Sequence, residues 1–371
     1  MPKMVSPDES MLVFEIDMDR RTFLGGVLGA GVATAGMPGR IPMGLNTYCL
    51  RALRWHDAQL LDYCAAQKLD AIFLQDSLDP KKDDPAHWKW VRGRAKELGL
   101  HLETGGSSLL PKDPSEMDAK MAMFRRNIER AAGMGAPLVR TLLASDRASM
   151  PPGPVEKHME TAIGMLRKVR AQAMDAGVKV AVEVHKDLLA REHRIVVETA
   201  GPEFVGTYLD TGNPVFVMED PMQTLEELGK YALTLHLRDS VVYEHPKGIA
   251  VQWVPLGEGT VDFKAIVAKA REICNPLHIY IKPITGRIPY VHPIFDDGYW
   301  KGYSDVRAAD FARFLALAKK GRPYEGHVVI EDLQNRPVPE PFVAAVQYQQ
   351  REHMERSIGY ARRELGLGVR G

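Results

Sequence analysis

The sequence has few cysteines and no excess of either charge. Only three cysteines, Cys49, Cys64 and Cys274, occur in 371 residues, and their wide spacing excludes a disulfide framework or a cysteine metal knuckle. Lys plus Arg and Asp plus Glu number 48 each, which gives no general attraction to nucleic acid or to anionic membranes. With 45% hydrophobic and 26% charged residues, the composition is that of a globular protein with one large α/β domain or two smaller ones.

The N-terminal segment carries a targeting pattern. Arg20 and Arg21 precede an apolar, Gly/Ala-rich run of roughly fourteen residues, too short for a membrane-spanning helix, and Ala33-Thr34-Ala35 offers a cleavage site. The segment resembles a twin-arginine export signal, because it matches R-R-x-F-L. We expect residues 1–37 to be this signal, with export to the periplasm and no stable membrane insertion. The alternative is a cytosolic tail.

Eight apolar strand-like runs follow, with a helical pattern in each gap. They are residues 41–48, 69–75, 100–105, 137–143, 178–185, 204–210, 232–239 and 277–283. Repeated strand–helix units indicate a parallel sheet, and eight of them favour a (β/α)8 TIM barrel over an open doubly wound sheet. We place the barrel in residues 38–325, with a long loop after the eighth strand, and a C-terminal helical extension in residues 326–371 packed on the barrel.

Polar residues end three successive predicted strands. Glu183, Asp210 and His236 stand at the C-terminal strand ends, where barrel enzymes build their sites. Two carboxylates and one imidazole suit a divalent metal ion, Mn, Mg, Co or Zn, in an open site. A single such residue is more often ion-paired or packed in the core, so the prediction of one metal ion rests on the three together.

Four motifs resemble one known family. VEVH at 182–185, LDTGN at 209–213, HLRD at 236–239 and VPLGEGTVDF at 254–263 are similar to the xylose isomerase-like TIM barrel superfamily. That group includes sugar isomerases and epimerases, inosose dehydratases and type-two apurinic endonucleases. In its isomerases and epimerases, the metal ligands are Glu, Asp, His and Glu from strands five to eight. The resemblance assigns the first three to Glu183, Asp210 and His236.

The fourth ligand position departs from the family pattern. By strand order it is Lys282, in LHIYIKP, whereas Glu331, in HVVIEDLQ, comes one helix too late. Either Glu331 completes the metal shell, or three ligands remain and Lys282 does acid–base work. We favour the second because barrel topology is harder to violate than local resemblance. A third interpretation is that Lys282 neutralises Glu183 or Asp210 in a site without metal.

Further residues are candidates for substrate contact. His185 points the same way as Glu183 under strand alternation and is a candidate catalytic residue, as a proton donor or a partner of a sugar hydroxyl. Arg238 and Asn213 are candidate substrate-binding residues; ketose epimerases of the family carry a histidine at the position of Asn213, which disfavours simple 3-epimerisation. Trp300, in the aromatic loop 284–303, is expected to stack on a sugar, although such aromatics equally pack a loop onto a barrel.

These residues predict metal-assisted proton abstraction next to a carbonyl of a sugar or glycoside. The enzyme would be an isomerase, an epimerase or a keto-glycoside lyase, with Lys282 or Glu183 as the base and the metal polarising the carbonyl. Two alternatives are a metal-dependent phosphodiesterase of the endonuclease branch and a non-catalytic carbohydrate-binding barrel. We expect a small-molecule partner and no nucleic acid, and a homo-oligomer is left open.

Overall fold

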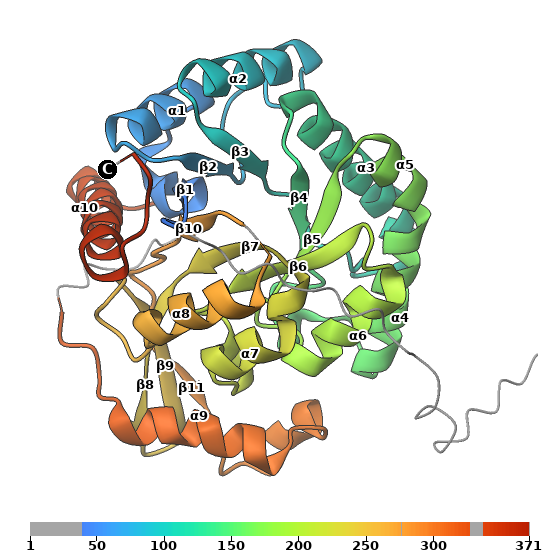
Figure 1. Ribbon diagram of the computed structural model, residues 1–371. Helices are drawn as coiled ribbons and strands as arrows, with labels where there is room; N and C mark the ends of the chain where they lie inside the picture. Colours follow the sequence, from blue (N-terminus) through green and yellow to red (C-terminus); the bar gives the residue numbers. More distant parts are fainter. Residues whose placement is uncertain (1–38, 276, 327–336, 371) are drawn as a thin grey trace, which may run out of the picture. The chain divides into compact units, whose positions relative to one another are not determined.

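Eight parallel strands close into a barrel, with helices on its outside (Figure 1). In this computed structural model the described residues are 39–275, 277–326 and 337–370, all within the compact unit Thr34–Gly371. Going round the barrel, the strands follow the order β1, β10, β7, β6, β5, β4, β3, β2. The twin-arginine segment and Glu331 lie outside the described residues, so export and a role for Glu331 stay predictions.

Each barrel strand lies inside one of the eight predicted runs. Their bounds are β1 Met43–Asn46, β2 Ala71–Leu74, β3 His101–Thr104, β4 Leu138–Thr141, β5 Lys179–Glu183, β6 Val205–Asp210, β7 Ala232–Leu237 and β10 Ile279–Ile281. The helices between them are α1 Asp57–Ala66, α2 Pro85–Glu97, α3 Met117–Met134, α4 Val155–Lys168, α5 Arg170–Asp175, α6 Ala190–Ala200, α7 Pro221–Leu228 and α8 Phe263–Ile273. The TIM barrel prediction is confirmed.

Side chains from alternate strand positions fill the barrel interior. Phe73, Tyr208 and Tyr280 meet there edge to face, with ring centroids 5.4 and 5.6 Å from Phe73. A closed eight-stranded barrel has an interior just wide enough for such side chains, so it is a packed core and not a pore. The same alternation turns the next inward residue of each strand toward the C-terminal mouth of the barrel.

A small antiparallel sheet is inserted around β10, and the sequence patterns did not predict it. It consists of β8 Asp239–His245, β9 Gly248–Val254 and β11 Tyr290–His292, in the order β11, β9, β8. Helix α9, Ala308–Lys320, buries Phe314 and Ala318 in one apolar cluster with Val242 and Val251 of this sheet. The predicted long loop after the eighth strand therefore contains a strand and forms one wall of the site.

The C-terminal helix α10, Glu340–Leu365, lies beside the segment that begins the barrel (Figure 1). Gln350 accepts a hydrogen bond of 2.8 Å from the backbone N–H of Ala52, and Gln347 donates one of 3.0 Å to the Ala52 carbonyl. Ala52 belongs to the 3-10 helix η2, Thr47–Leu53, directly after β1. The predicted helical extension is present. None of the described helices has both the length and the apolar character needed to cross a bilayer.

Candidate active site

Five charged residues from five strands meet at the C-terminal end of the barrel. Glu183 and Asp210 are the last residues of β5 and β6, Arg140 lies in β4, and Arg238 and Lys282 follow β7 and β10. Each is at most 6% exposed. Burying charges is costly unless they are paired, so the geometry of these pairs decides what the site can do.

Lys282 lies between the two carboxylates. Its Nζ is 2.8 Å from Glu183 Oε1 and 3.1 Å from Asp210 Oδ2. This arrangement is the one expected if Lys282 neutralises the two acids. The Lys282 amine contacts both carboxylates, a geometry that also suits an interaction with a negatively charged ligand group. The role of Lys282 as a base stays a prediction, and its two ion pairs also suit an electrostatic role.

Two arginines contact the same carboxylates from other directions. Arg140 donates from Nε to Glu183 Oε2 at 2.5 Å, and Arg238 Nη2 lies 3.0 Å from Asp210 Oδ2. Burial alone would raise the pKa of Glu183, but the charges of Arg140 and Lys282 outweigh burial and hold that pKa well below its usual value. Three cations thus face two carboxylates, and the cluster has a surplus positive charge.

Asn213 positions this network instead of lining the cavity. Its Nδ2 donates to the Val184 carbonyl at 2.9 Å and to Glu183 Oε1 at 3.3 Å, and its Oδ1 accepts from Arg238 Nη1 at 3.0 Å. The side chain is fully buried and is absent from the described lining of the cavity. Its contacts in the structure are with the charged cluster, and its contact with substrate stays a prediction.

His236 lies in an aromatic stack. Its ring centroid is 3.8 Å from that of Tyr208 and 4.8 Å from that of Tyr280, both nearly parallel to it. Its Nε2 is 3.3 Å from Thr234 Oγ1. Burial, and secondly the charge of Lys282, lower the pKa of His236 well below its usual value, so the ring is neutral.

The divalent ion implied by the family resemblance does not fit this donor set as it stands. Both Glu183 oxygens and Asp210 Oδ2 face cationic groups, and Asp210 Oδ1 accepts the backbone N–H groups of Gly212 and Asn213 at 2.9 and 3.1 Å. A dication would add two positive charges to a cluster that already has more cations than anions. Within the described residues, the groups with three close ligand atoms lie elsewhere, at His101–Glu103–His278 and Asp57–Asp79–His87.

A cavity of about 960 Å³ opens above the charged cluster. Its described lining includes six cationic residues, Arg140, Arg147, Lys186, Arg238, Lys282 and Arg287, and two acidic ones, Asp76 and Asp146. A volume of this size suits a small-molecule ligand. Four of these cations are paired with acids behind the wall, Arg140, Arg238 and Lys282 with Glu183 and Asp210, and Arg147 with Glu192. The positive charge that remains favours an anionic ligand.

His185 is the predicted catalytic residue that the structure places on the cavity wall in an uncharged form. It is half-buried, and its Nδ1 has no hydrogen-bond partner among the described residues. Desolvation lowers the pKa of His185 to about 3 despite the opposing charge of Glu183. The neutral imidazole presents an Nδ1 lone pair without a described partner to a ligand in the cavity.

Trp300 packs the inserted segment and does not line the described cavity. Its Nε1 donates to the Ile294 carbonyl at 2.9 Å, and its ring meets Phe311 edge to face at 5.2 Å. Tyr290, Tyr299 and Tyr303 from the same segment line the cavity in its place. The aromatic loop thus lines the cavity through residues other than Trp300, and stacking on a sugar stays a prediction.

The sequence analysis missed Arg140, Lys186 and Trp253. Arg140 had a detectable signal, because it is a charged residue inside an apolar strand, the same anomaly that drew attention to Lys282. Trp253 belongs to the unpredicted strand β9 and lies beneath the Arg238 guanidinium, whose carbon is 4.4 Å from the ring centroid. Lys186 Nζ lies 5.6 Å from the same ring and 3.9 Å from Asp146 Oδ2.

Two curated proteins are similar in sequence to this chain. YihM of Escherichia coli (strain K12) is 22% identical over 284 residues, which cover 72% of this chain and 81% of YihM. The 3-oxo-isoapionate decarboxylase of Pectobacterium atrosepticum is 24% identical over 210 residues, 56% of this chain and 65% of the decarboxylase.

Solved structures share the fold at low identity. A D-psicose 3-epimerase matches 88% of this chain and 100% of its own with a TM-score of 0.58 and 15% identity. The IOLI protein, whose structure holds a zinc atom, matches 75% of this chain and 95% of its own with a TM-score of 0.53 and 16% identity.

The family model of the xylose isomerase-like TIM barrel matches residues 61–276, more than half of the sequence. This match agrees with the closed barrel and with the strand-end position of the charged cluster. The chain belongs to the xylose isomerase-like TIM barrel family.

Proposed function

We propose that this protein is an enzyme that forms an enolate or enediolate from a keto-sugar acid, as an isomerase, an epimerase or a lyase. The observation that carries the proposal is the Lys282 ammonium, which bridges Glu183 and Asp210 at the floor of a cationic cavity. In the family's metal-dependent reactions a dication stabilises the oxyanion. Here a fixed ammonium would do so.

Lys282 and Arg238 would stabilise the developing oxyanion. Both are buried and line the cavity, and their ion pairs with Asp210 hold their positive ends in place before substrate arrives. Preorganised charges in a site without bulk water stabilise a transition-state oxyanion strongly, because no reorganisation is needed during the reaction.

His185 would remove the proton next to the carbonyl. Its imidazole is neutral over the physiological pH range, since its pKa is lowered to about 3 by desolvation. Glu183, the other predicted base, is engaged by Arg140 and Lys282 and is less suited to take a proton. In a lyase reaction, protonated His185 would return its proton to the leaving group.

A carboxylate on the substrate accounts for the cations that the cluster itself does not neutralise. The floor holds three cations against two carboxylates, and Lys186 Nζ on the wall lies 3.9 Å from Asp146 Oδ2, the far limit of an ion pair. Desolvation, the largest influence, lowers the pKa of Lys186, which indicates a wall from which water is partly excluded. A substrate carboxylate placed there would gain charge-assisted hydrogen bonds.

The experiment is hydrogen exchange from solvent D2O into a panel of keto-aldonates and matched neutral ketoses, followed by NMR with the purified full chain. We expect exchange at the carbon next to the carbonyl of an acid, at a rate at least about 100-fold above that with its neutral analogue. His185→Gln, which keeps the size of the side chain, should abolish exchange without loss of binding. Exchange confined to neutral ketoses would contradict the proposal, and binding without turnover would favour the carbohydrate-binding barrel.

Decarboxylation is a second candidate reaction on the same substrate class. The 3-oxo-isoapionate decarboxylase relative and the cationic floor favour it, because loss of CO2 from a 3-oxo acid also leaves an enolate, whose oxygen needs the same stabilisation. Release of CO2 from a 3-keto-aldonate, with one solvent deuteron on the carbon that carried the carboxylate, would distinguish it from proton abstraction.

The metal-dependent form of the reaction, with Glu183, Asp210 and His236 as ligands, requires Lys282 to leave both carboxylates. It predicts that turnover needs added Mn²⁺, Mg²⁺, Co²⁺ or Zn²⁺ and disappears after chelation. We expect instead that turnover by EDTA-treated protein at 25 °C stays within about twofold of the untreated rate.

The pH dependence should identify His185 as an imidazole that is neutral in the folded protein. A histidine with a lowered folded pKa contributes stability above its unfolded pKa of 6.5, and that stability is lost as the pH falls toward its folded pKa of about 3. We expect kcat/KM to show no acid limb with a midpoint near 6.5 between pH 5 and 8. An acid limb with a midpoint near 6.5 in the parent protein would contradict the assigned protonation state.

A further inference from the structure

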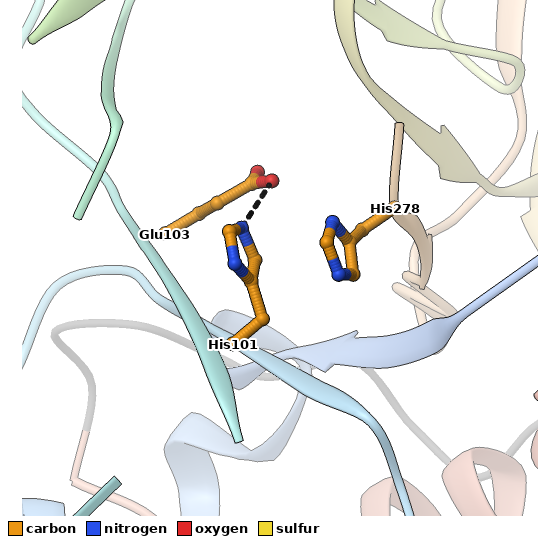
Figure 2. Close-up of side chains that lie close together, drawn as sticks. All are labelled: His101, Glu103 and His278. Atoms are coloured by element: carbon orange, nitrogen blue, oxygen red, sulfur yellow. Dashed lines mark hydrogen bonds and ion pairs between the residues drawn. The ribbon is translucent and has the colours of Figure 1, made fainter. Parts of the chain in front are cut away.

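The N-terminal end of the barrel holds a second cluster of possible ligands, away from the cavity. His101 is the first residue of β3, Glu103 is two residues further on, and His278 directly precedes β10. Figure 2 shows the two imidazoles side by side with the Glu103 carboxylate above His101. One ligand atom from each of the three lies within 4.8 Å of those of the other two.

Glu103 is a buried carboxylate whose charge is poorly compensated. It is 2% exposed, and its Oε1 is 3.3 Å from His101 Nε2. Its Oε2 is buried and has no hydrogen-bond partner among the described residues. Burial raises the pKa of Glu103, and the hydrogen bond and charge of His101, with smaller contributions from Thr234 and Tyr280, offset this only in part. Such an oxygen is costly to bury unless a cation compensates for it.

The two histidines stack on each other, which is an unfavourable arrangement for two charged rings. Their centroids are 3.8 Å apart and their planes differ by 2°. Burial, and secondly the charge of His101, lower the pKa of His278 to about 4, so His278 is neutral and has a lone pair to offer. Its imidazole makes no hydrogen bond to another described side chain.

We propose that His101, Glu103 and His278 bind one divalent ion of the zinc type at the base of the barrel. Two imidazoles and one carboxylate form a borderline ligand set that suits Zn²⁺. Ligand atoms of one tetrahedral zinc lie about 3.4 Å apart, given bonds of roughly 2.0–2.1 Å. The distance of 3.3 Å between His101 Nε2 and Glu103 Oε1 matches this spacing. The half-buried His278 ring would have to rotate toward these two atoms to become the third ligand. His101 is 31% exposed, which leaves room for water as a fourth ligand.

The ion would link strands that are not neighbours. In the barrel order, β1 and β2 lie between β10 and β3. Because an ion bound only by the folded protein shifts the unfolding equilibrium, it would stabilise the closure of the barrel. At the N-terminal face of a TIM barrel a stabilising role is expected rather than a catalytic one. The proposal is independent of the proposed function.

The test is a zinc titration of the untagged, EDTA-treated and dialysed full chain, with a chromophoric chelator as competitor. We expect one ion per chain with a Kd below about 1 μM, and a rise in Tm of about 5 °C at a 100-fold excess of ZnCl2 over Kd. Glu103→Gln and His278→Asn should each weaken binding at least about 10-fold and remove the rise in Tm. Their circular dichroism without zinc reports whether they fold.

The matched control is His87→Asn, because His87 with Asp57 and Asp79 forms the other close group of ligands. His87→Asn should keep the zinc affinity of the parent protein. As a spectroscopic check, Co²⁺ should give ligand-field absorption bands in the parent protein and in His87→Asn that are absent in His278→Asn. If His278→Asn and the parent bind zinc equally, or if neither binds below about 100 μM, the proposal is overturned and the cluster is a hydrogen-bonded pair with a stacked histidine.

Discussion

Lys282→Met should lower kcat/KM for the keto-sugar acid by about 1000-fold. Methionine keeps the unbranched apolar part of the side chain but removes the ammonium that bridges Glu183 Oε1 and Asp210 Oδ2. The oxyanion would lose its fixed positive charge, and two buried carboxylates would lose their shared partner. Steady-state kinetics measure the effect, and the loss should fall mainly on kcat, since the stabilisation is stronger in the transition state than in the ground state.

The matched control for this variant is Lys186→Met, which removes a lysine from the wall of the same cavity. Since Lys186 would bind the substrate carboxylate and not the reacting oxygen, we expect a higher KM with kcat changed by less than about 10-fold. If Lys282→Met kept its kcat, the ammonium would be a purely structural counter-ion. If added Mn²⁺ restored the turnover of Lys282→Ala, a metal ion and the ammonium would be interchangeable in this position.

Glu183→Gln should lower the free energy of unfolding by about 3–5 kcal/mol. The substitution keeps the shape of the side chain but leaves Arg140, Lys282 and Arg238 facing Asp210 alone in a buried cluster. Removing one partner of a buried ion-pair network leaves an uncompensated charge, which costs more than the original pairs contributed. Urea denaturation at pH 7, followed by circular dichroism, measures the difference.

The effect should depend on pH in a defined direction. The pKa of folded Glu183 lies well below its usual value of 4.5, because the charges of Arg140 and Lys282 outweigh its burial. Its contribution is therefore fully present above pH 4.5 and is lost as the pH falls through the folded pKa, so the two proteins should converge in acid. Glu203→Gln, at an exposed pair with Arg170, should change stability by about 0.5 kcal/mol or less. Equal effects of the two substitutions would contradict the assigned network.

Strand alternation was enough to predict which side chains point into the barrel. Lys282 follows two isoleucines in a three-residue buried strand, and Glu183 and Asp210 each end a run of apolar residues. Period-two alternation is a property of neighbouring residues, so it can be predicted from the chain itself. The inserted sheet escaped prediction because β8 and β9 pair with each other across a tight turn instead of continuing the strand–helix repeat.

The sequence by itself determined the number of barrel strands, their order along the chain and the end of the barrel at which the acids and Lys282 gather. Only the tertiary structure decided that Lys282 lies between the acids and that Arg140 and Arg238 complete the network. Likewise, only the barrel closure brings His278 against His101, 177 positions apart in the numbering (278 minus 101). The physical reason is that side-chain direction follows from local backbone geometry, whereas ion-pair distances between strands depend on which strands become neighbours when the barrel closes.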